Sequence, residues 1–280
     1  MERPRPRKKR LRERPRFRKG ISIVPSLFTI GNIFCGYYAI MSTLKGTYDN
    51  AAVAIGLGAV LDGLDGRIAR LTDTASDFGL ELDSLADVLT FGIAPAVLAF
   101  SWGLGSFAGT DAEIVKHVTQ LGWVSTFAFV LCGALRLARF NLQSKKPQES
   151  SPKRFFVGLP IPAAAGMVAA IVHFFKKPIL LVGSAMLWYV LIALVAFLMI
   201  STVRYYSFKE LDLKKPQPGA VLVGIALIVA AIFFYSEYVL LLLATIYAAS
   251  GPVVKLVQLV RRFLVVPSET DERGPASQIP

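Results

Sequence analysis

Long apolar stretches alternate with short polar segments along most of the chain. A helix needs about 20 mainly apolar residues to cross the hydrocarbon core of a bilayer. We therefore predict an all-α fold, a polytopic integral membrane helical bundle with about eight transmembrane helices. The last two are the least distinct, because little more than Ser236 and Glu237 separates them. The expected spans are residues 22–44, 51–72, 79–103, 119–141, 157–175, 178–200, 218–235 and 237–257.

Composition agrees with this fold class, because 54% of the residues are hydrophobic, more than an ordinary soluble domain contains. All the spans fit one packed membrane domain at residues 21–258. A basic tail at 1–20 precedes it. The segment at 259–280 is rich in proline, serine and charged residues, so we expect a flexible tail there.

Basic residues outside the spans are unevenly distributed. The first twenty residues hold 11 lysines and arginines, and the net charge is +12. Positive loops stay on the cytoplasmic side of a membrane, so we expect a cell-membrane protein with a cytoplasmic N-terminus. An even number of spans returns the C-terminus to the cytoplasm, and the loop at 73–78 also faces inward. We expect no nucleic-acid partner, because no stacking platform or recognised binding fold accompanies the basic tail.

Cysteine and histidine offer little chemistry in this sequence. Cys35 and Cys132 lie in apolar spans without a close partner in sequence, which indicates buried free thiols rather than a disulfide or a zinc site. His117 and His173 look isolated. No pattern of Ser/His/Asp catalysis, a metalloprotease or a P-loop is present.

Four aspartates, in contrast, stand in strongly apolar surroundings: Asp62, Asp65, Asp83 and Asp87. Each carboxylate costs about 2.5–3.5 kcal/mol at the centre of a membrane helix, so something must compensate them. The first pair is three residues apart and the second pair four, so each pair shares one face of its helix. The two helices form a hairpin across the loop at 73–78. This predicts that all four carboxylates converge in one cleft at shallow membrane depth.

Converging carboxylates without histidine or thiolate favour hard divalent cations, namely Mg²⁺, Mn²⁺ or Ca²⁺. Two such ions offset four negative charges and suit a displacement at phosphorus. Arg70 is a candidate for holding a phosphate oxygen. The alternative is a purely structural role, with Arg67 and Arg70 as ion-pair partners. Two arginines, however, cannot neutralise four aspartates.

The pattern Asp62-x2-Asp65-Gly66-x2-Ala69-Arg70-x8-Gly79-x3-Asp83-x3-Asp87 resembles the signature of the CDP-alcohol phosphatidyltransferases at every position. The resemblance implies a membrane enzyme in which an alcohol attacks the β-phosphate of a CDP-linked lipid and expels CMP. It also implies two bound divalent cations, Mg²⁺ or Mn²⁺ with Ca²⁺ as a possible occupant, and a homodimer.

The resemblance also assigns roles by position. Asp62, Asp65 and Asp83 become metal ligands, and Asp87 becomes both a ligand and the general base. Space for the nucleotide is left by Gly66, Ala69 and Gly79. Contact with its phosphates is assigned to Arg70.

Four further segments resemble the phosphatidylserine synthase branch of that family: residues 26–32, 135–141, 158–162 and 203–209. This implies CDP-diacylglycerol as donor and L-serine as acceptor. Thr29 and Asn32 are then candidates for binding the nucleotide. A serine acceptor carries a carboxylate, which a guanidinium holds well, so the candidate serine- or phosphate-binding residues are Arg136, Arg139 and Asn141.

Two other interpretations stay open at this level. The first keeps the enzyme class but changes the acceptor to glycerol phosphate or an inositol phosphate. In either enzyme the donor lipid can equally be the ether-linked CDP-archaeol. The other makes the chain a divalent-metal transporter or channel. That class requires polar residues continuing to the outer face, and the sequence contains no such ladder.

Overall fold

The computed structural model describes residues 23–72, 77–105, 107, 109–144, 155–206 and 219–264, with the backbone alone at some positions near the ends of these ranges. The predicted tail at 1–20 and most of the one at 259–280 lie outside them. In chain order the elements are α2 (Ile23–Leu44), α3 (Tyr48–Thr72), α4 (Asp77–Asp87), the π-helical turn η1 (Val88–Ile93), α5 (Ala94–Gly103), α6 (Ala112–Ser144), β1 (Phe155–Val157), α7 (Ile161–Phe175), α8 (Val182–Ile200), β2 (Arg204–Tyr206) and α9 (Gly219–Leu264).

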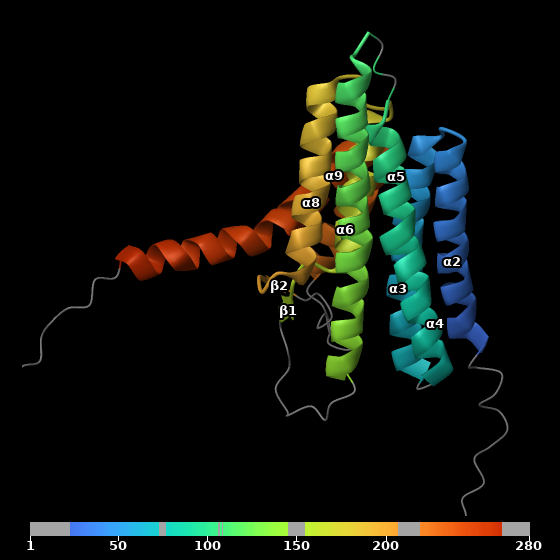
Figure 1. Cartoon of the computed structure of the whole chain (residues 1–280). Coiled ribbons are helices and arrows are strands. Elements are labelled where there is room, and N and C mark those ends of the chain that lie inside the picture. The colour runs from blue at the N-terminus through green and yellow to red at the C-terminus, as the bar shows by residue number, and fades with distance from the viewer. Residues whose placement is uncertain are drawn as a thin grey trace, which may run out of the picture.

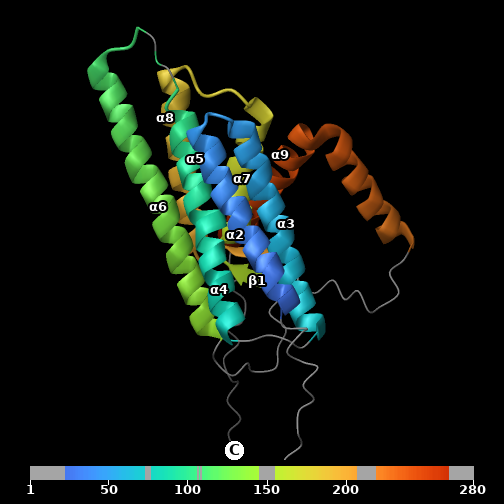
Figure 2. The ribbon, with the colours of Figure 1, turned by 90° about the vertical axis from the view of Figure 1, so that its right-hand side faces the viewer.

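The helices α2 to α8 stand side by side as an upright bundle, with α4, η1 and α5 forming one continuous rod (Figures 1 and 2). We call the end where α3 stops and α4 starts the aspartate end. The end where α2 turns into α3 is the far end. The predicted class, a polytopic membrane helical bundle, is confirmed.

The predicted number of spans is too high. Among the described residues, five helical segments are long and apolar enough to cross a membrane: Leu27–Leu44, Phe78–Gly103, Ala112–Leu142, Val182–Ile200 and Ala226–Gln258. Helix α7 is apolar but has only 15 residues, and α3 is diluted by its charged side chains. The predicted seventh and eighth spans correspond to two helical segments of α9, which meet at a kink where Tyr235 leaves the helical conformation (φ −135°, ψ 44°), as the predicted division at Ser236 and Glu237 requires.

The turn η1 packs the rod of α4, η1 and α5 against α2 and α3. Thr90 in η1 is fully buried and donates a hydrogen bond to the backbone carbonyl of Asn32 (2.8 Å). A Cβ on Gly36 would lie 2.5 Å from Oγ1 of Thr90, and one on Gly58 would lie 2.7 Å from its Cγ2. Gly36 and Gly58 therefore let α2 and α3 pack closely against η1, which directly follows Asp87 in the chain.

Helix α8 is fixed to α5 by two aromatic side chains. Nε1 of Trp188 donates to the carbonyl of Ala99 (2.9 Å), and the Tyr189 hydroxyl donates to that of Phe100 (3.0 Å). These bonds satisfy buried polar groups that would otherwise be costly in an apolar interior. They complete a core made almost entirely of apolar side chains.

A short antiparallel ribbon occupies the place where the fifth span was predicted to begin. Strand β1 pairs with β2, with Phe156 opposite Tyr205. Gly158 then turns the chain at a φ of 82°, and a Cβ there would lie 2.2 Å from the carbonyl oxygen of Met199. Helix α7 starts only at Ile161, after Pro160. A helix start at residue 157 was wrong because this glycine conformation and the proline both oppose helix continuation.

A polar cluster joins three helices at the far end. In α7, His173 has its Nδ1 2.5 Å from Oδ1 of Asp49 in the first turn of α3 and its Nε2 2.9 Å from Oγ of Ser236 at the α9 bend. Lys176 forms an ion pair with Glu237 (2.5 Å). We call these five residues the far-end clasp. The prediction that His173 is isolated was wrong, because its partners are distant in sequence.

Candidate active site

Three of the four predicted aspartates meet at the aspartate end of the bundle. Carboxylate oxygens of Asp62, from α3, and of Asp83 and Asp87, from α4, lie within 4.8 Å of one another. In the described part of the chain, no other group of three or more acidic, histidine or cysteine side chains is close enough to hold a metal ion. Such a set of hard oxygen donors can hold a divalent cation.

The fourth aspartate lies outside this trio. Asp65 is only 6% exposed, and its carboxylate accepts a hydrogen bond from the hydroxyl of Thr29 on α2. Asp62 and Asp65 are one helical turn apart on the same side of α3, but the Asp65 carboxylate is bound by Thr29 instead of joining the trio. The interaction explains why a polar Thr29 is buried in an apolar helix.

Helix α2 contributes a second polar side chain one turn further on. Asn32 is fully buried, and among the described residues neither its Oδ1 nor its Nδ2 has a hydrogen-bond partner. Its Oδ1 would lie 2.9 Å from a Cβ on Gly58 of α3. A buried amide with unsatisfied donors and acceptors is costly in an apolar interior, which favours a ligand role.

The residues predicted to make room for a nucleotide lie at the same end. A Cβ placed on Gly66 meets nothing within 4 Å, so this position faces open space. Gly79 lies in the first turn of α4. Ala69 and Arg70 belong to the last turns of α3, but their side chains lie outside what the structure describes.

The three candidate acceptor residues of α6 have different surroundings. Arg136 is half-buried and interacts electrostatically with Asp87, and its buried Nε has no hydrogen-bond partner in the described part of the chain. Arg139 is exposed. Asn141 donates a hydrogen bond from Nδ2 to Oγ of Ser84 on α4 (2.9 Å), which ties α6 to the aspartate-bearing helix.

Sequence reasoning missed one residue near this site. Tyr247 of α9 is close enough to Arg136 of α6 for a charge on one to affect the other, although the two lie in different helices far apart in the chain. No sequence pattern marked Tyr247, because an aromatic residue in an apolar helix is ordinarily a packing residue.

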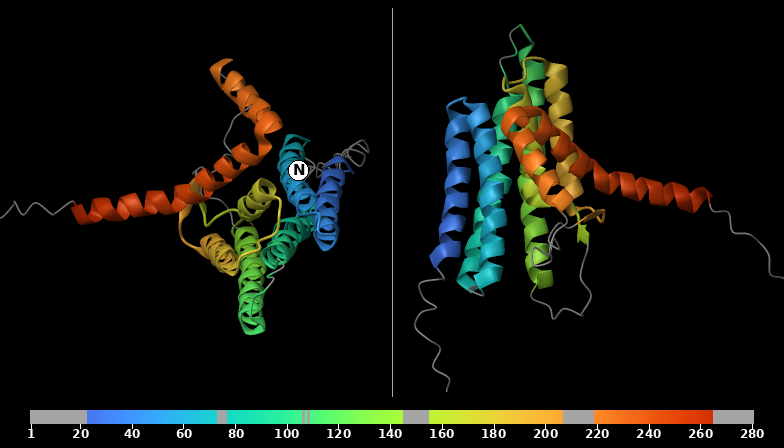
Figure 3. Two further views of the ribbon diagram at one scale, coloured as in Figure 1. Left: turned by 90° about the horizontal axis from the view of Figure 1, so that it is seen from above. Right: turned by 180° about the vertical axis from the view of Figure 1, so that it is seen from behind.

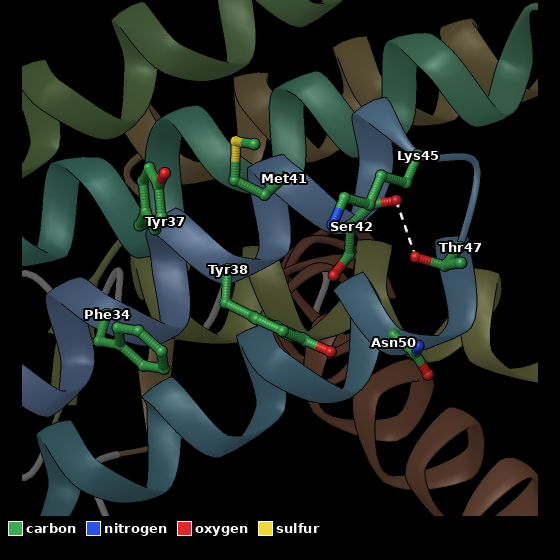
Figure 4. A pocket seen from close by; sticks show the side chains of 8 residues that line it. All are labelled: Phe34, Tyr37, Tyr38, Met41, Ser42, Lys45, Thr47 and Asn50. Atoms are coloured by element: carbon green, nitrogen blue, oxygen red, sulfur yellow. Dashed lines mark hydrogen bonds between the residues drawn. The ribbon is translucent and has the colours of Figure 1, made fainter.

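The structure also has a hollow of about 460 Å³, and it is separate from the aspartates. It lies toward the far end, against the last turns of α2 and the start of α3 (Figure 4). The Thr47 hydroxyl closes the turn beside it by donating to the carbonyl of Ser42 (2.9 Å). The lining residues are Phe34, Tyr37, Tyr38, Met41, Ser42, Lys45, Thr47 and Asn50. With no acidic residue among them, this hollow does not extend the carboxylate site.

A helical membrane bundle with a cluster of carboxylates near an arginine is an arrangement suited to phosphoryl-type transfer. The sequence model of the CDP-alcohol phosphatidyltransferases matches residues 22–195, more than half of the chain. The chain belongs to this family.

Three curated relatives share the same name, CDP-diacylglycerol–serine O-phosphatidyltransferase. The Helicobacter pylori protein is 38% identical over 189 residues, which cover 67% of this chain and 73% of the relative. The Bacillus subtilis protein is 38% identical over 192 residues, 68% of this chain and 93% of the relative. The Methanocaldococcus jannaschii protein is 35% identical over 188 residues, 67% and 76% respectively.

Proposed function

We propose that the chain transfers the phosphatidyl group of CDP-diacylglycerol to L-serine, which yields phosphatidylserine and CMP. The observation that carries this proposal is the carboxylate trio of Asp62, Asp83 and Asp87 with Arg136 beside it. The shared name of the bacterial and archaeal relatives supports serine as the acceptor.

The donor set fits two divalent cations, Mg²⁺ or Mn²⁺, with Ca²⁺ as a possible occupant. Three carboxylates lie within reach of one another, and no described cysteine or histidine belongs to their group, which matches the preference of these hard ions. Asp62, Asp83 and Asp87 would hold them, with Asp65 as the further ligand. When bound, the ions neutralise the donor's phosphates and the charge that develops on the leaving group.

The protein's own groups orient the acceptor and move its proton. The hydroxyl oxygen of serine forms a bond to the β-phosphorus, while the bond between that phosphorus and the CMP oxygen breaks. The hydroxyl proton passes to Asp87, whose buried Oδ1 has no hydrogen-bond partner among the described residues. Arg136 holds the carboxylate of serine, and the exposed Arg139 together with Asn141 lines the approach.

Binding of the donor falls to the signature residues and to α2. The open space at Gly66 receives the nucleotide, Ala69 and Gly79 leave further room, and Arg70 contacts phosphate. Thr29 and Asn32 supply hydrogen bonds. The acyl chains stay in the bilayer while the CDP group enters from the side, so the donor is an ester lipid or an ether lipid such as CDP-archaeol.

Orientation and assembly complete the proposal. The aspartate end and both termini face the cytoplasm, because the basic N-terminal tail holds that side inward. Water-soluble serine then reaches the site directly. Two copies of the chain form a homodimer.

An acceptor panel tests this function. Purified protein is given CDP-diacylglycerol, Mg²⁺ or Mn²⁺, and L-serine, glycerol 3-phosphate or an inositol phosphate in turn, and CMP release is measured. We expect CMP release with L-serine as the acceptor and none with either phosphorylated acceptor. Release only with a phosphorylated acceptor would keep the family chemistry and overturn the serine assignment. No release with any acceptor would contradict the proposed reaction.

A further inference from the structure

The hollow near the far end of the bundle has features of a binding site of its own (Figure 4). Its volume of about 460 Å³ falls in the range of about 300–1,000 Å³ that ligand pockets occupy. Seen from the far end, α2 and α3 lie side by side at the edge of the bundle (Figure 3). Of the lining residues, Phe34 is 63% exposed and Tyr38 is 45% exposed. In a bundle that spans a membrane, such a face meets lipid.

The lining side chains change from apolar to charged along α2. Phe34, Tyr38 and Lys45 are spaced by four and seven residues, so they lie on one face of the helix. The rings of Phe34 and Tyr38 have centroids 6.4 Å apart and form an apolar wall. Lys45 directly follows the membrane-spanning segment Leu27–Leu44, which places it at the membrane surface. The face is therefore apolar toward the bilayer centre and cationic at the surface, in the same order as a phospholipid of that leaflet.

A tight turn between α2 and α3 builds the polar end of the hollow. Gly46 has a φ of 74°, a conformation that favours glycine. The backbone N–H of Thr47 and its hydroxyl both donate to the carbonyl of Ser42, at 2.9 Å each. The turn that carries Lys45 is thus held by its own hydrogen bonds. A site that is formed in advance loses less conformational entropy when it binds a ligand.

The polar end carries a positive charge that no described residue balances. Lys45 is exposed, and it forms no ion pair within the part of the chain that the structure describes. The acidic residue closest to it in sequence, Asp49, is bonded to His173 instead. Asn50 adds an exposed amide that can donate to an anion. A lysine with an unbalanced charge beside a neutral donor suits a phosphate group.

The apolar wall decides which phosphate-bearing ligand fits this hollow. A water-soluble anion would contact Lys45 and leave the rings of Phe34 and Tyr38 uncovered. A second copy of the chain, docked symmetrically, would present the same face, with its own Lys45 and no acidic lining residue to pair with it. A phospholipid satisfies both parts, because its phosphate meets the lysine and its acyl chains cover the rings.

We propose that this hollow binds one anionic phospholipid from the leaflet at the far end of the bundle. The headgroup phosphate lies between Lys45 and Asn50, and an acyl chain follows α2 past Tyr38 to Phe34. Because its contacts come from α2 and α3 together, the lipid stabilises this pair of helices at their turn. The site is distinct from the donor site at the aspartate end, and it does not depend on which acceptor the enzyme uses.

Thermal unfolding of the full-length protein in detergent, with added lipid, tests this site. The probes are dioleoylphosphatidylglycerol, dioleoylphosphatidylcholine and inorganic phosphate. We expect phosphatidylglycerol to raise the melting temperature of wild type more than phosphatidylcholine does, because a ligand that binds only the folded state stabilises it. Lys45→Gln should weaken the apparent affinity for phosphatidylglycerol about tenfold, as for loss of a hydrogen bond to a charged group. Inorganic phosphate should give no shift that depends on Lys45.

Matched variants test the charge and the apolar wall separately. Lys116→Gln removes an exposed lysine near the start of α6; it changes the net charge equally and should leave the lipid affinity at the wild-type level. Lys45→Arg keeps the charge and should retain binding. Phe34→Ala should weaken the affinity for phosphatidylglycerol severalfold through lost apolar contact. Phe127→Ala, which removes a ring of α6 that is 66% exposed, should not.

The results that would overturn the proposal are distinct from a failure of the transferase activity, since none of them uses serine turnover. Equal stabilisation of wild type and Lys45→Gln by phosphatidylglycerol would overturn it, as would an equal loss of affinity in Lys116→Gln. A Lys45-dependent shift with inorganic phosphate as large as that with lipid would make this a simple anion site. A changed oligomeric state of Lys45→Gln with unchanged lipid affinity would assign the face to a second copy. If Lys45→Gln does not fold, the comparison of Phe34→Ala with Phe127→Ala decides, and equal affinities of these two would overturn the proposal.

Discussion

His173 and Asp49 join helices that are distant in sequence: Nδ1 of the imidazole lies 2.5 Å from Oδ1 of the carboxylate at the far end of the bundle. The other ring nitrogen contacts Ser236 (2.9 Å). The side chain of His173 is only 12% exposed, so it has little access to water as a replacement partner.

Removing this contact should destabilise the fold. We expect His173→Ala to lower the free energy of unfolding by about 1–3 kcal/mol, because Ser236 and Asp49 lose their partner and a cavity opens. Thermal unfolding in detergent measures this. The control is His117→Ala, since that exposed ring contacts only the Glu113 carbonyl of its own helix among the bonds described. Equal melting temperatures for the two variants would contradict the clasp.

The ion pair of Lys176 and Glu237 should make stability depend on pH. The hydrogen bond that Lys176 donates to the Glu237 carboxylate, and the negative charge of that carboxylate, raise the pKa of Lys176 above its ordinary value of 10.5. A raised folded-state pKa means that the stabilisation is fully present below the ordinary pKa and is lost as pH rises through the raised one. The melting-temperature difference between wild type and Lys176→Gln should be small, because the pair is exposed. It should vanish at high pH and shrink in high salt. A difference that grows with pH would contradict this sign.

Because α3 packs closely against η1 at Gly58, a single methyl group added at this residue should destabilise the fold. Gly58→Ala places a Cβ 2.7 Å from Cγ2 of Thr90 and 2.9 Å from Oδ1 of Asn32. We expect a loss of about 1–3 kcal/mol in unfolding free energy from overpacking. Gly56→Ala, two residues away in the same helix, meets nothing within 4 Å and should stabilise by up to about 1 kcal/mol through helix propensity. Equal unfolding free energies for the two variants would be incompatible with this packing.

Because Gly66 faces open space, a methyl group added there should affect nucleotide binding without affecting folding. A Cβ there meets nothing within 4 Å, so Gly66→Ala should fold at least as well as wild type. If the nucleotide occupies that space, the KM for CDP-diacylglycerol should rise about tenfold, equivalent to about 1.4 kcal/mol. Gly63→Ala, one turn earlier and equally open, is the control and should keep the donor KM. Unchanged donor KM in both variants would remove Gly66 from the nucleotide site.

The sequence predicted those features of the fold and of the candidate site that residues close together in the chain determine. The sequence predicted that all four carboxylates converge, and three of them do: Asp83 and Asp87 share a face of α4 through their i, i+4 spacing, and the helical hairpin brings Asp62 of α3 to them. Asp65 departs from that pattern because Thr29, from another helix, draws its carboxylate away. Arg136 was a candidate from chemistry, but only packing separates it from the exposed Arg139.

Features created by tertiary contacts were not predictable. The π-helical turn at Val88–Ile93 has an apolar sequence that reads equally well as α-helix, and its role appears only when Thr90 meets the carbonyl of Asn32. The far-end clasp also joins residues far apart in the chain. The ribbon was missed because a three-residue strand is too short for a pattern of alternating residues to be distinct.

The most direct test of the account is formation of labelled phosphatidylserine from labelled L-serine and CDP-diacylglycerol by the purified chain. The account predicts product with Mg²⁺ or Mn²⁺, none after chelation, and a loss of at least about a hundredfold in Asp87→Asn. Activity should be retained in Asp111→Asn, an exposed aspartate that precedes α6 and is outside the trio. Undiminished product formation by Asp87→Asn, or in the presence of chelator, would show that the aspartates of α3 and α4 do not carry the reaction.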